Sequence, residues 1–412
     1  MPLFRYLPTP SERMGVLWTL SSIKDAYVIE YGPAGTTHYG IESYSRMNSS
    51  LLASIYTTHM EEDDIVMGDT ERLERVITEI DYQHKPKYIF VVASSVSSII
   101  GADVKAICYG LKSDINAHLI TFTGGGFKGS YNLGCRDVLT CLADNVIGQP
   151  SESDSKLYNI IGSNIDCYNF ESDMKEIENL MFNCFGMRLN TSFTANSSLD
   201  RIASASNAGL NIVLRAEGLE CAEIMNKRHN IPFCYGLPYG YDGTYQWLQN
   251  IKDITGISCD KTFLHKQSER QKDHILELKY LQRGRKPINA VISGNFDPAF
   301  GIAQFLKNEL DITSEAVFIN HDNNLEHFAK GLEASSGVML FNAGEDKKKN
   351  IVDETQPEVI IGDSFLIQIS PSDVAKILFS NPNTQKRLLC SHMPFVGFKG
   401  ADYILERIIN TL

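Results

Sequence analysis

Short apolar runs alternate with amphipathic stretches along most of this chain. Residues 87–93 are almost entirely apolar, as expected for a strand that is buried on both faces of a sheet. Residues 69–80 place apolar side chains such as Leu73 and Ile77 at helical spacing, and residues 26–31 form another β-rich run before them. Together these segments predict a β-α-β unit, which builds a parallel sheet covered by helices.

The same alternation recurs in two later sections of the chain. Strands are expected at 26–31, 87–93, 117–122, 157–162, 187–193, 210–214, 288–294, 316–319 and 359–364. Helices are expected at 69–80, 173–184, 198–208, 218–229, 259–281, 298–310 and 400–412. The pattern predicts an α/β protein of three Rossmann-like, doubly wound domains with mainly parallel sheets. In such folds, ligands bind in clefts at the carboxyl ends of the strands.

The length of 412 residues exceeds what one hydrophobic core supports, so several domains are expected. We expect an N-terminal α/β domain at 1–148, a middle Rossmann-like domain at 149–284 and a C-terminal one at 285–399. The polar stretch 148–156 has almost nothing to bury and is interpreted as the first linker. The helix at 400–412 is expected to pack back onto the N-terminal domain.

Charge and composition exclude several classes of function. The net charge of −12 argues against a nucleic-acid binder, because that function needs concentrated Lys and Arg. No run approaches the roughly 20 apolar residues of a membrane span, and the first residues lack the apolar core of a signal peptide. We therefore expect a cytoplasmic protein with no nucleic-acid or membrane partner. The nine cysteines include no Cys-x-x-Cys pair, so neither a disulfide framework nor a zinc site is expected.

Eight short motifs follow one another along the chain. They are 13–16, 31–35, 60–69, 85–89 with 99–103, 125–129 with Gly134, 230–233, 240–244 and 394–401. Their order and spacing resemble nitrogenase component 1 type oxidoreductases, a family that includes nitrogenase molybdenum–iron protein subunits, protochlorophyllide reductase-like proteins and cofactor-assembly relatives. For example, Tyr31 to Gly35 is similar to the family's glycine-proline-x-glycine-cysteine turn.

The resemblance implies an oxidoreductase subunit. Family members pair as two similar chains, and two such pairs often assemble into a tetramer. An ATP-dependent iron–sulfur reductase docks on the pair and passes in electrons, which a cluster at the pair interface receives. A metallocofactor or a bound tetrapyrrole inside one subunit is then reduced.

Three loops occupy the positions where the family keeps its cluster cysteines, and none of them contains a cysteine. They are 10–15, 32–37 and 93–103. By the resemblance, Thr36 stands at the second cysteine, Ser95 at the third, and Ser11 or Glu12 near the first. Neutral hydroxyls are poor iron ligands, so we expect no metal ligand here and no cofactor held by this chain alone. The alternative that an iron–sulfur cluster is shared with a partner chain is left open.

The resemblance also assigns single positions near a cofactor. Loop positions implied in cofactor binding are Gly32, Gly35, Thr36, Ser95, Gly126 and Gly129. In the family's catalytic subunit a cysteine ligates the cofactor, and Leu214 falls at that position. The cofactor histidine falls near Arg387, and His392 is not assigned its role because it lies five residues away.

Cys135 is the candidate catalytic residue. The family's catalytic subunit has a cofactor-facing histidine after the glycine that corresponds to Gly134. A thiol at a helix N-terminus behind a glycine-rich loop can have a lowered pKa, so Cys135 is expected to ligate metal or donate a proton. The alternative is a packed residue of the helix.

Structural explanations stand beside the functional ones for other loops. The glycines of 124–129 serve tight turns, or their amides face a cluster or anion. The serines of 94–98 cap the following helix or line a polar pocket. The acidic run 61–64 is a solvated surface loop or a docking site for a basic reductase.

Three functional hypotheses follow. The first is a subunit of a nitrogenase-like component 1 complex that lacks its own cluster ligands and pairs with a homologous chain, or with a second copy. The second is a non-redox scaffold that binds a metallocofactor precursor or a tetrapyrrole. The third, a small-molecule-binding protein with hinged α/β domains, fits the motifs least well.

Overall fold

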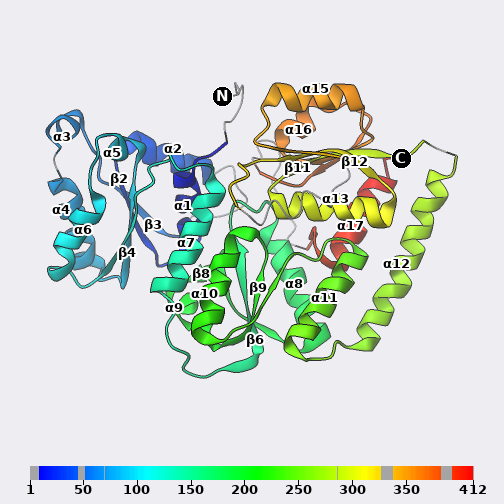
Figure 1. Cartoon of the computed structure of the whole chain (residues 1–412), viewed down its shortest axis with the longest axis horizontal. Coiled ribbons are helices and arrows are strands. Elements are labelled where there is room, and N and C mark those ends of the chain that lie inside the picture. The colour runs from blue at the N-terminus through cyan, green and yellow to red at the C-terminus, as the bar shows by residue number, and fades with distance from the viewer. Residues whose placement is uncertain are drawn as a thin grey trace.

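The apolar runs form the strands of three main parallel sheets in a computed structural model of the chain (Figure 1). The structure describes residues 9–44, 52–68, 70–284, 286–325, 337–381 and 392–411. Across these residues, every pairing between named strands is parallel. The predicted α/β class with parallel sheets is therefore confirmed.

The first sheet has the strand order β3-β2-β4-β5. Its strands are β2 (Tyr27–Tyr31), β3 (Ser54–Thr57), β4 (Tyr88–Ala93) and β5 (His118–Phe122). The helices of this section are α1 (Glu12–Ser21), α2 (Ala34–Tyr44), α3 (Glu62–Met67), α4 (Glu71–His84), α5 (Ser95–Ile99), α6 (Val104–Gly110), the 3-10 turn η1 (Leu111–Ser113) and α7 (Tyr131–Asn145). Alternate residues of β4 serve opposite faces, because Ile89 packs with Ile77 of α4 whereas Phe90 shares a core with Leu17 of α1 and Leu139 of α7.

The second sheet has the order β10-β9-β6-β7. Its strands are β6 (Asp154–Ser163), β7 (Arg188–Thr194), β9 (Ala208–Val213) and β10 (Phe233–Tyr235). Its helices are α8 (Phe170–Phe185), α9 (Leu199–Ala203), η2 (Ser204–Asn207), η3 (Ala216–Gly218), α10 (Leu219–His229), α11 (Tyr241–Thr255) and α12 (Lys261–Gln282). A short pairing of β1 (Ile23–Lys24) with β8 (Ser197–Ser198) ties the first two sections together.

The third sheet has the order β13-β12-β11-β14-β15. Its strands are β11 (Asn289–Gly294), β12 (Thr313–Ile319), β13 (Val338–Phe341), β14 (Val359–Gly362) and β15 (Ala375–Leu378). Its helices are α13 (Phe296–Leu310), α15 (Glu345–Thr355) and α16 (Ser364–Ile369). Figure 1 shows α15 and α16 on one side of this sheet and α13 on the other, as a doubly wound section requires.

Two expectations about the chain's organisation need correction. The stretch 148–156 is not wholly a linker, because β6 begins at Asp154. The last helix, α17 (Gly397–Ile409), packs against α8, α11 and α12 of the second section and against β15 of the third sheet, so the expectation that it covers the N-terminal domain is wrong. Its apolar face marks it as a core helix but does not specify which surface it covers. The exact domain boundaries stay predictions.

The helices α1 and α7 approach each other closely through two glycines. A Cβ atom added at Gly134 would lie 1.9 Å from the carbonyl oxygen of Glu12, and one added at Gly15 would lie 1.9 Å from that of Tyr131. These distances leave no room for a methyl group.

Within the described residues, none of the helices combines the length and apolarity needed to cross a bilayer.

Replacing Gly134 by Ala is expected to destabilise the fold by about 1–3 kcal/mol, because the new methyl group overlaps the backbone of α1. Gly243→Ala is the matched control, since this helical glycine of α11 has no neighbour within 4 Å of the position that a methyl group would take. We expect Gly243→Ala to be neutral or slightly stabilising. Urea unfolding measures both changes, and equal midpoints for the two variants would contradict the packing argument.

Candidate functional site

The glycine-rich loop 124–129 lies against the start of α1. The amide of Gly126 donates a 2.8 Å hydrogen bond to Oε1 of Glu12, and the amide of Glu12 donates one of 2.9 Å to the carbonyl of Gly129. Gly126 and Gly129 have φ angles of 96° and 146°, which only glycine adopts readily. The loop therefore makes tight turns and also presents an amide to an anion, which is a carboxylate of the same chain.

The third cysteine-free loop meets the glycine-rich loop. The hydroxyl of Ser95 donates a 2.7 Å hydrogen bond to the carbonyl of Gly125. Ser94 caps α5, because its side chain accepts a 3.1 Å bond from the amide of Ser97. The capping interpretation is confirmed for Ser94. Ser95 instead joins the loop 93–103 to the glycine-rich loop 124–129 by its hydrogen bond to Gly125.

The second cysteine-free loop reaches the third through Gly32. A Cβ atom at Gly32 would lie 2.3 Å from the hydroxyl of Ser94, so the two loops touch. The hydroxyl of Thr36 donates a 2.8 Å bond to the carbonyl of Pro33, and Gly35 is exposed with no neighbour within 4 Å of a Cβ position. The candidate loop positions are thus brought into one region. Their hydroxyls bond to backbone carbonyls, and their roles in cofactor binding stay predictions.

Buried charge lies beneath these loops. Arg13 forms an ion pair with Glu30 of β2, whose side chain is fully buried. Glu12 is 2% exposed, and its Oε2 has no hydrogen-bond partner among the described residues. A buried carboxylate oxygen without a donor is costly, and the described residues supply no donor to this atom.

The acidic run 61–64 opens α3. Asp64 accepts a hydrogen bond from the amide of Glu61, and Arg72 pairs with Asp64 at 2.8 Å and Glu61 at 2.9 Å. Arg72 therefore neutralises part of the negative charge of the acidic run 61–64.

Cys135 does not have the environment expected for it. It lies one turn inside α7 and is 1% exposed, with Sγ 3.9 Å from the carbonyl of Gly15 and 3.5 Å from Nδ2 of Asn164. Burial raises the pKa of its thiol, so the expectation of a lowered pKa is wrong. Cys135 is also not among the residues that line the cleft described next.

A cleft opens where the second and third sheets meet, beside the segment that leads into α17. Most of its polar lining lies at the carboxyl ends of strands or in the loops that follow them, where α/β folds bind ligands, and Asp173 comes from the first turn of α8. The polar residues that line it are Ser163, Asp166, Cys167, Asn169, Asp173, Arg215, Asn295 and Ser380. Leu214, which stands at the family's cofactor-cysteine position, lines it as well. His392 is exposed, and Arg387 lies outside the described residues.

Arg215 organises the cleft. Its guanidinium bonds to both carboxylate oxygens of Asp166 at 2.8 Å and to Glu217 at 2.9 and 3.1 Å, and all three side chains are buried. Asp166 also accepts a bond of 3.3 Å from Asn295, whose Oδ1 accepts one from the hydroxyl of Tyr131. The cleft therefore connects all three sections of the chain.

Two buried acids in and near the cleft have raised pKa values. Burial and the nearby charge of Glu217 raise the pKa of Asp297 to about 7. Burial raises the pKa of Asp173 to about 7, although the amide of Phe395 donates to it at 2.7 Å. Both acids can therefore hold a proton close to neutral pH.

Sequence reasoning missed Cys167. Its Sγ lies 3.8 Å from Nη1 of Arg215 and 3.9 Å from the carbonyl of Gly162. Burial raises the pKa of this thiol to about 12. The signal that could have found it is its position just after the strand expected at 157–162, where ligands of α/β folds bind.

The raised pKa of Asp297 predicts a pH dependence of stability. Between about pH 4 and pH 7 the folded state keeps a proton that the unfolded state has released, so stability falls as pH rises. From pH 5 to pH 8, the wild type is expected to lose on the order of 2 kcal/mol relative to Asp297→Asn. Urea unfolding at both pH values measures this, with Asp353→Asn, an exposed position, as control. Parallel pH profiles for wild type and Asp297→Asn would disprove the assignment.

Comparisons with known proteins agree with this architecture. Two relatives are nitrogenase iron-molybdenum cofactor biosynthesis proteins NifE. The one from Nostoc sp. is 26% identical over 410 residues, covering 97% of this chain and 82% of its own. The one from Methanococcus maripaludis is 29% identical over 362 residues, covering 84% and 73%.

A solved structure, "Nitrogenase Cp1 at pH 6.5", superposes with a TM-score of 0.83 at 16% identity, covering all of this chain and 94% of the other, which shows a shared fold. The family model for nitrogenase component 1 type oxidoreductases matches residues 11–412. This chain therefore belongs to the nitrogenase component 1 type oxidoreductase family.

Proposed function

We propose that this chain is an assembly scaffold that holds a metal–sulfur cofactor precursor, as cargo, in the cleft around Arg215. The observation that carries the proposal is a contrast between two regions. At the family's cluster positions the hydroxyls of Thr36 and Ser95 bond to backbone carbonyls, whereas the cleft keeps a thiol, Cys167, in its lining. The similar proteins named for iron-molybdenum cofactor biosynthesis favour a precursor over a tetrapyrrole.

The donor chemistry of the cleft supports a metal-containing ligand. A thiol suits iron, and the pKa of Cys167 makes it neutral until a metal displaces its proton. Within the described residues, no three His, Cys, Asp or Glu side chains form a closed metal site. We expect the precursor to bring its own sulfide and to take few ligands from this chain, as suits cargo that is later passed on.

The size of the cleft sets a condition on loading. Its enclosed space is about 60 Å³, enough for a few water molecules. A precursor of many atoms requires the walls to move apart. The second and third sheets form opposite walls, so a hinge between them is the motion that we propose for loading.

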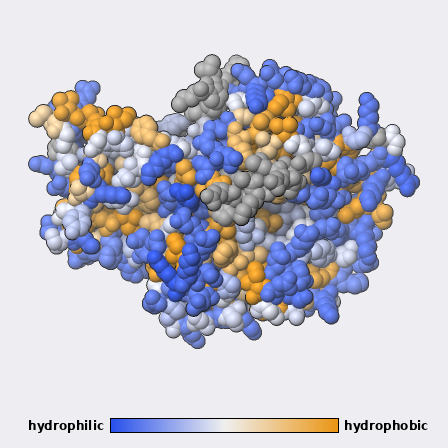
Figure 2. Space-filling view, in the orientation of Figure 1, coloured by the Kyte–Doolittle hydropathy of each residue, from blue (hydrophilic) through white to orange (hydrophobic). Residues whose placement is uncertain are grey.

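We propose further that the chain works with a homologous partner chain. Figure 2 shows apolar side chains gathered over α3 and α5 at one end of the first section. Val66, Met67 and Ile99 there are 81%, 80% and 73% exposed. Large exposed apolar side chains in a group are typical of protein interfaces.

A second candidate function is that of an electron-accepting subunit. The family description as oxidoreductases favours it, and an ATP-dependent iron–sulfur reductase would be the electron donor. In this case the cluster would be held mainly by the partner chain, because the loops here supply no thiolate.

Anaerobic purification from the native host distinguishes the two functions. A scaffold is expected to co-purify with a homologous chain and to carry iron and sulfide that can be transferred to an acceptor protein. An electron-accepting subunit would instead keep its iron and be reduced by an iron–sulfur reductase with ATP. A stable homodimer free of iron and sulfide would contradict both.

Cys167→Ser is expected to lower the iron retained after anaerobic reconstitution with ferrous iron and sulfide by at least about tenfold, because serine replaces the thiol that lines the cleft. Cys141→Ser is the matched control, since Cys141 is also half-buried but lies outside the cleft. Iron per chain and the visible absorption spectrum measure the effect. Equal loss in both variants, or in neither, would remove Cys167 from the proposed site.

A further inference from the structure

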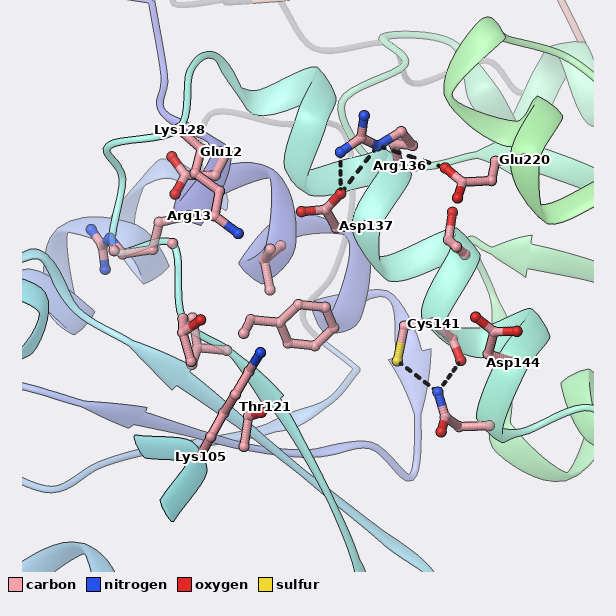
Figure 3. A pocket seen from close by; sticks show the side chains of 18 residues that line it. Glu12, Arg13, Lys105, Thr121, Lys128, Arg136, Asp137, Cys141, Asp144 and Glu220 are labelled. Carbon is pink, nitrogen blue, oxygen red and sulfur yellow. Dashed lines mark hydrogen bonds and ion pairs between the residues drawn. The ribbon is translucent and has the colours of Figure 1, made fainter. Parts of the chain in front are cut away.

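A second pocket lies between the edge strand β5 and the helix α7, and it shares no lining residue with the cleft around Arg215. Its volume of about 370 Å³ falls in the range of small-molecule sites. Figure 3 shows Glu12, Arg13 and Lys128 along one side and Lys105 with Thr121 on the opposite side.

Glu12 is the buried polar group of this pocket. One carboxylate oxygen, Oε1, accepts the amide of Gly126 at 2.8 Å, so the side chain is fixed in place. The other, Oε2, is buried and has no partner among the described residues. Its neighbour Arg13 is already paired with Glu30 and is not available to neutralise it. A ligand that donates a charged hydrogen bond would satisfy this oxygen.

Two lysines give the same end of the pocket its positive charge. Figure 3 shows the side chains of Lys105 and Lys128 extending toward the middle of the pocket from opposite sides. The stem of Lys128 passes within 3.2 Å of the position that a Cβ of Gly124 would take, next to the Glu12 carboxylate. In the part of the chain that is described, neither ammonium group has an ion-pair partner.

The charged groups at the other end of the pocket pair with one another and carry one excess negative charge, since three carboxylates face two guanidinium groups. Arg136 pairs with Asp137 at 2.6 Å and approaches Glu220 at 4.0 Å. Asp144 pairs with Arg228 on α10. At the Glu12 end, the groups left for a ligand are one carboxylate oxygen and two ammonium groups, with a net charge of +1 between them.

We propose that this pocket binds an acidic amino acid. The ligand's ammonium group donates to Oε2 of Glu12, and its two carboxylates face Lys105 and Lys128. Its net charge of −1 balances the +1 of the three protein groups. A simple dicarboxylate would leave the Glu12 oxygen without a donor, and a neutral amino acid would leave one lysine without an anion.

Calorimetric titration of the wild-type chain with three matched ligands tests this assignment without relying on any variant. L-Glutamate is expected to bind about tenfold or more tightly than glutarate, which lacks the ammonium group. It is expected to exceed 4-aminobutyrate, which lacks one carboxylate, by a similar factor. L-Aspartate tests the preferred length, and preference for either acidic amino acid over its analogues supports the proposal.

Variants then assign the contacts. Glu12→Gln keeps an acceptor for the Gly126 amide and is expected to remove the preference for glutamate over glutarate. Lys105→Met and Lys128→Met are expected to weaken glutamate and glutarate alike, whereas Lys112→Met, an exposed control, is expected to change neither. Absence of binding by both acidic amino acids at millimolar concentration overturns the proposal. A glutamate-to-glutarate ratio that Glu12→Gln leaves unchanged overturns it too.

Discussion

The buried ion group of Arg215, Asp166 and Glu217 is the contact on which the junction of the second and third sheets depends. Arg215 follows β9 and Asp166 follows β6, so their pairing fixes the ends of two neighbouring strands. Asn295 and Asn381, which follow strands of the third sheet, both bond to Asp166. A guanidinium removed from water must be matched by carboxylates, and losing one partner would leave an uncompensated charge at the junction.

The same group leaves an excess of negative charge in the cleft. Two carboxylates face one guanidinium, and Asp297 lies nearby with its hydrogen bond from the amide of Ala216. The raised pKa of Asp297 limits this excess of negative charge, because the carboxyl group can bind a proton and become neutral. His321 is buried and its pKa is lowered by desolvation, so it adds no positive charge at neutral pH. A cation brought in with a ligand would therefore find a favourable potential there.

Sequence patterns predicted the strands and helices more reliably than the contacts between them. The strand at 87–93 and the helix at 259–281 appear as β4 and α12 because an apolar run or a long polar helical pattern is a local property. The placement of α17 was wrong, because an apolar face does not identify its partner surface. The environment of Cys135 was wrong for a similar reason, since the burial that raises its pKa comes from α1 and Asn164, far away in the sequence. The loops at the family's cysteine positions meet in the folded chain, but no local pattern could reveal that Glu12 would accept the Gly126 amide.

The glycine contacts between α1 and α7 have a mechanical consequence. At these two glycines the backbones of α1 and α7 leave no room for a methyl group, so the helices are closely packed and neither can tilt toward the other. Helix α1 begins with Glu12, which contacts the glycine-rich loop 124–129. Both helices also contact residues beside the cleft around Arg215. Thr19 of α1 accepts a 3.0 Å bond from Asn164, and Tyr131 of α7 reaches Asn295. Through these two helices, the loop region and the cleft belong to one continuously packed unit.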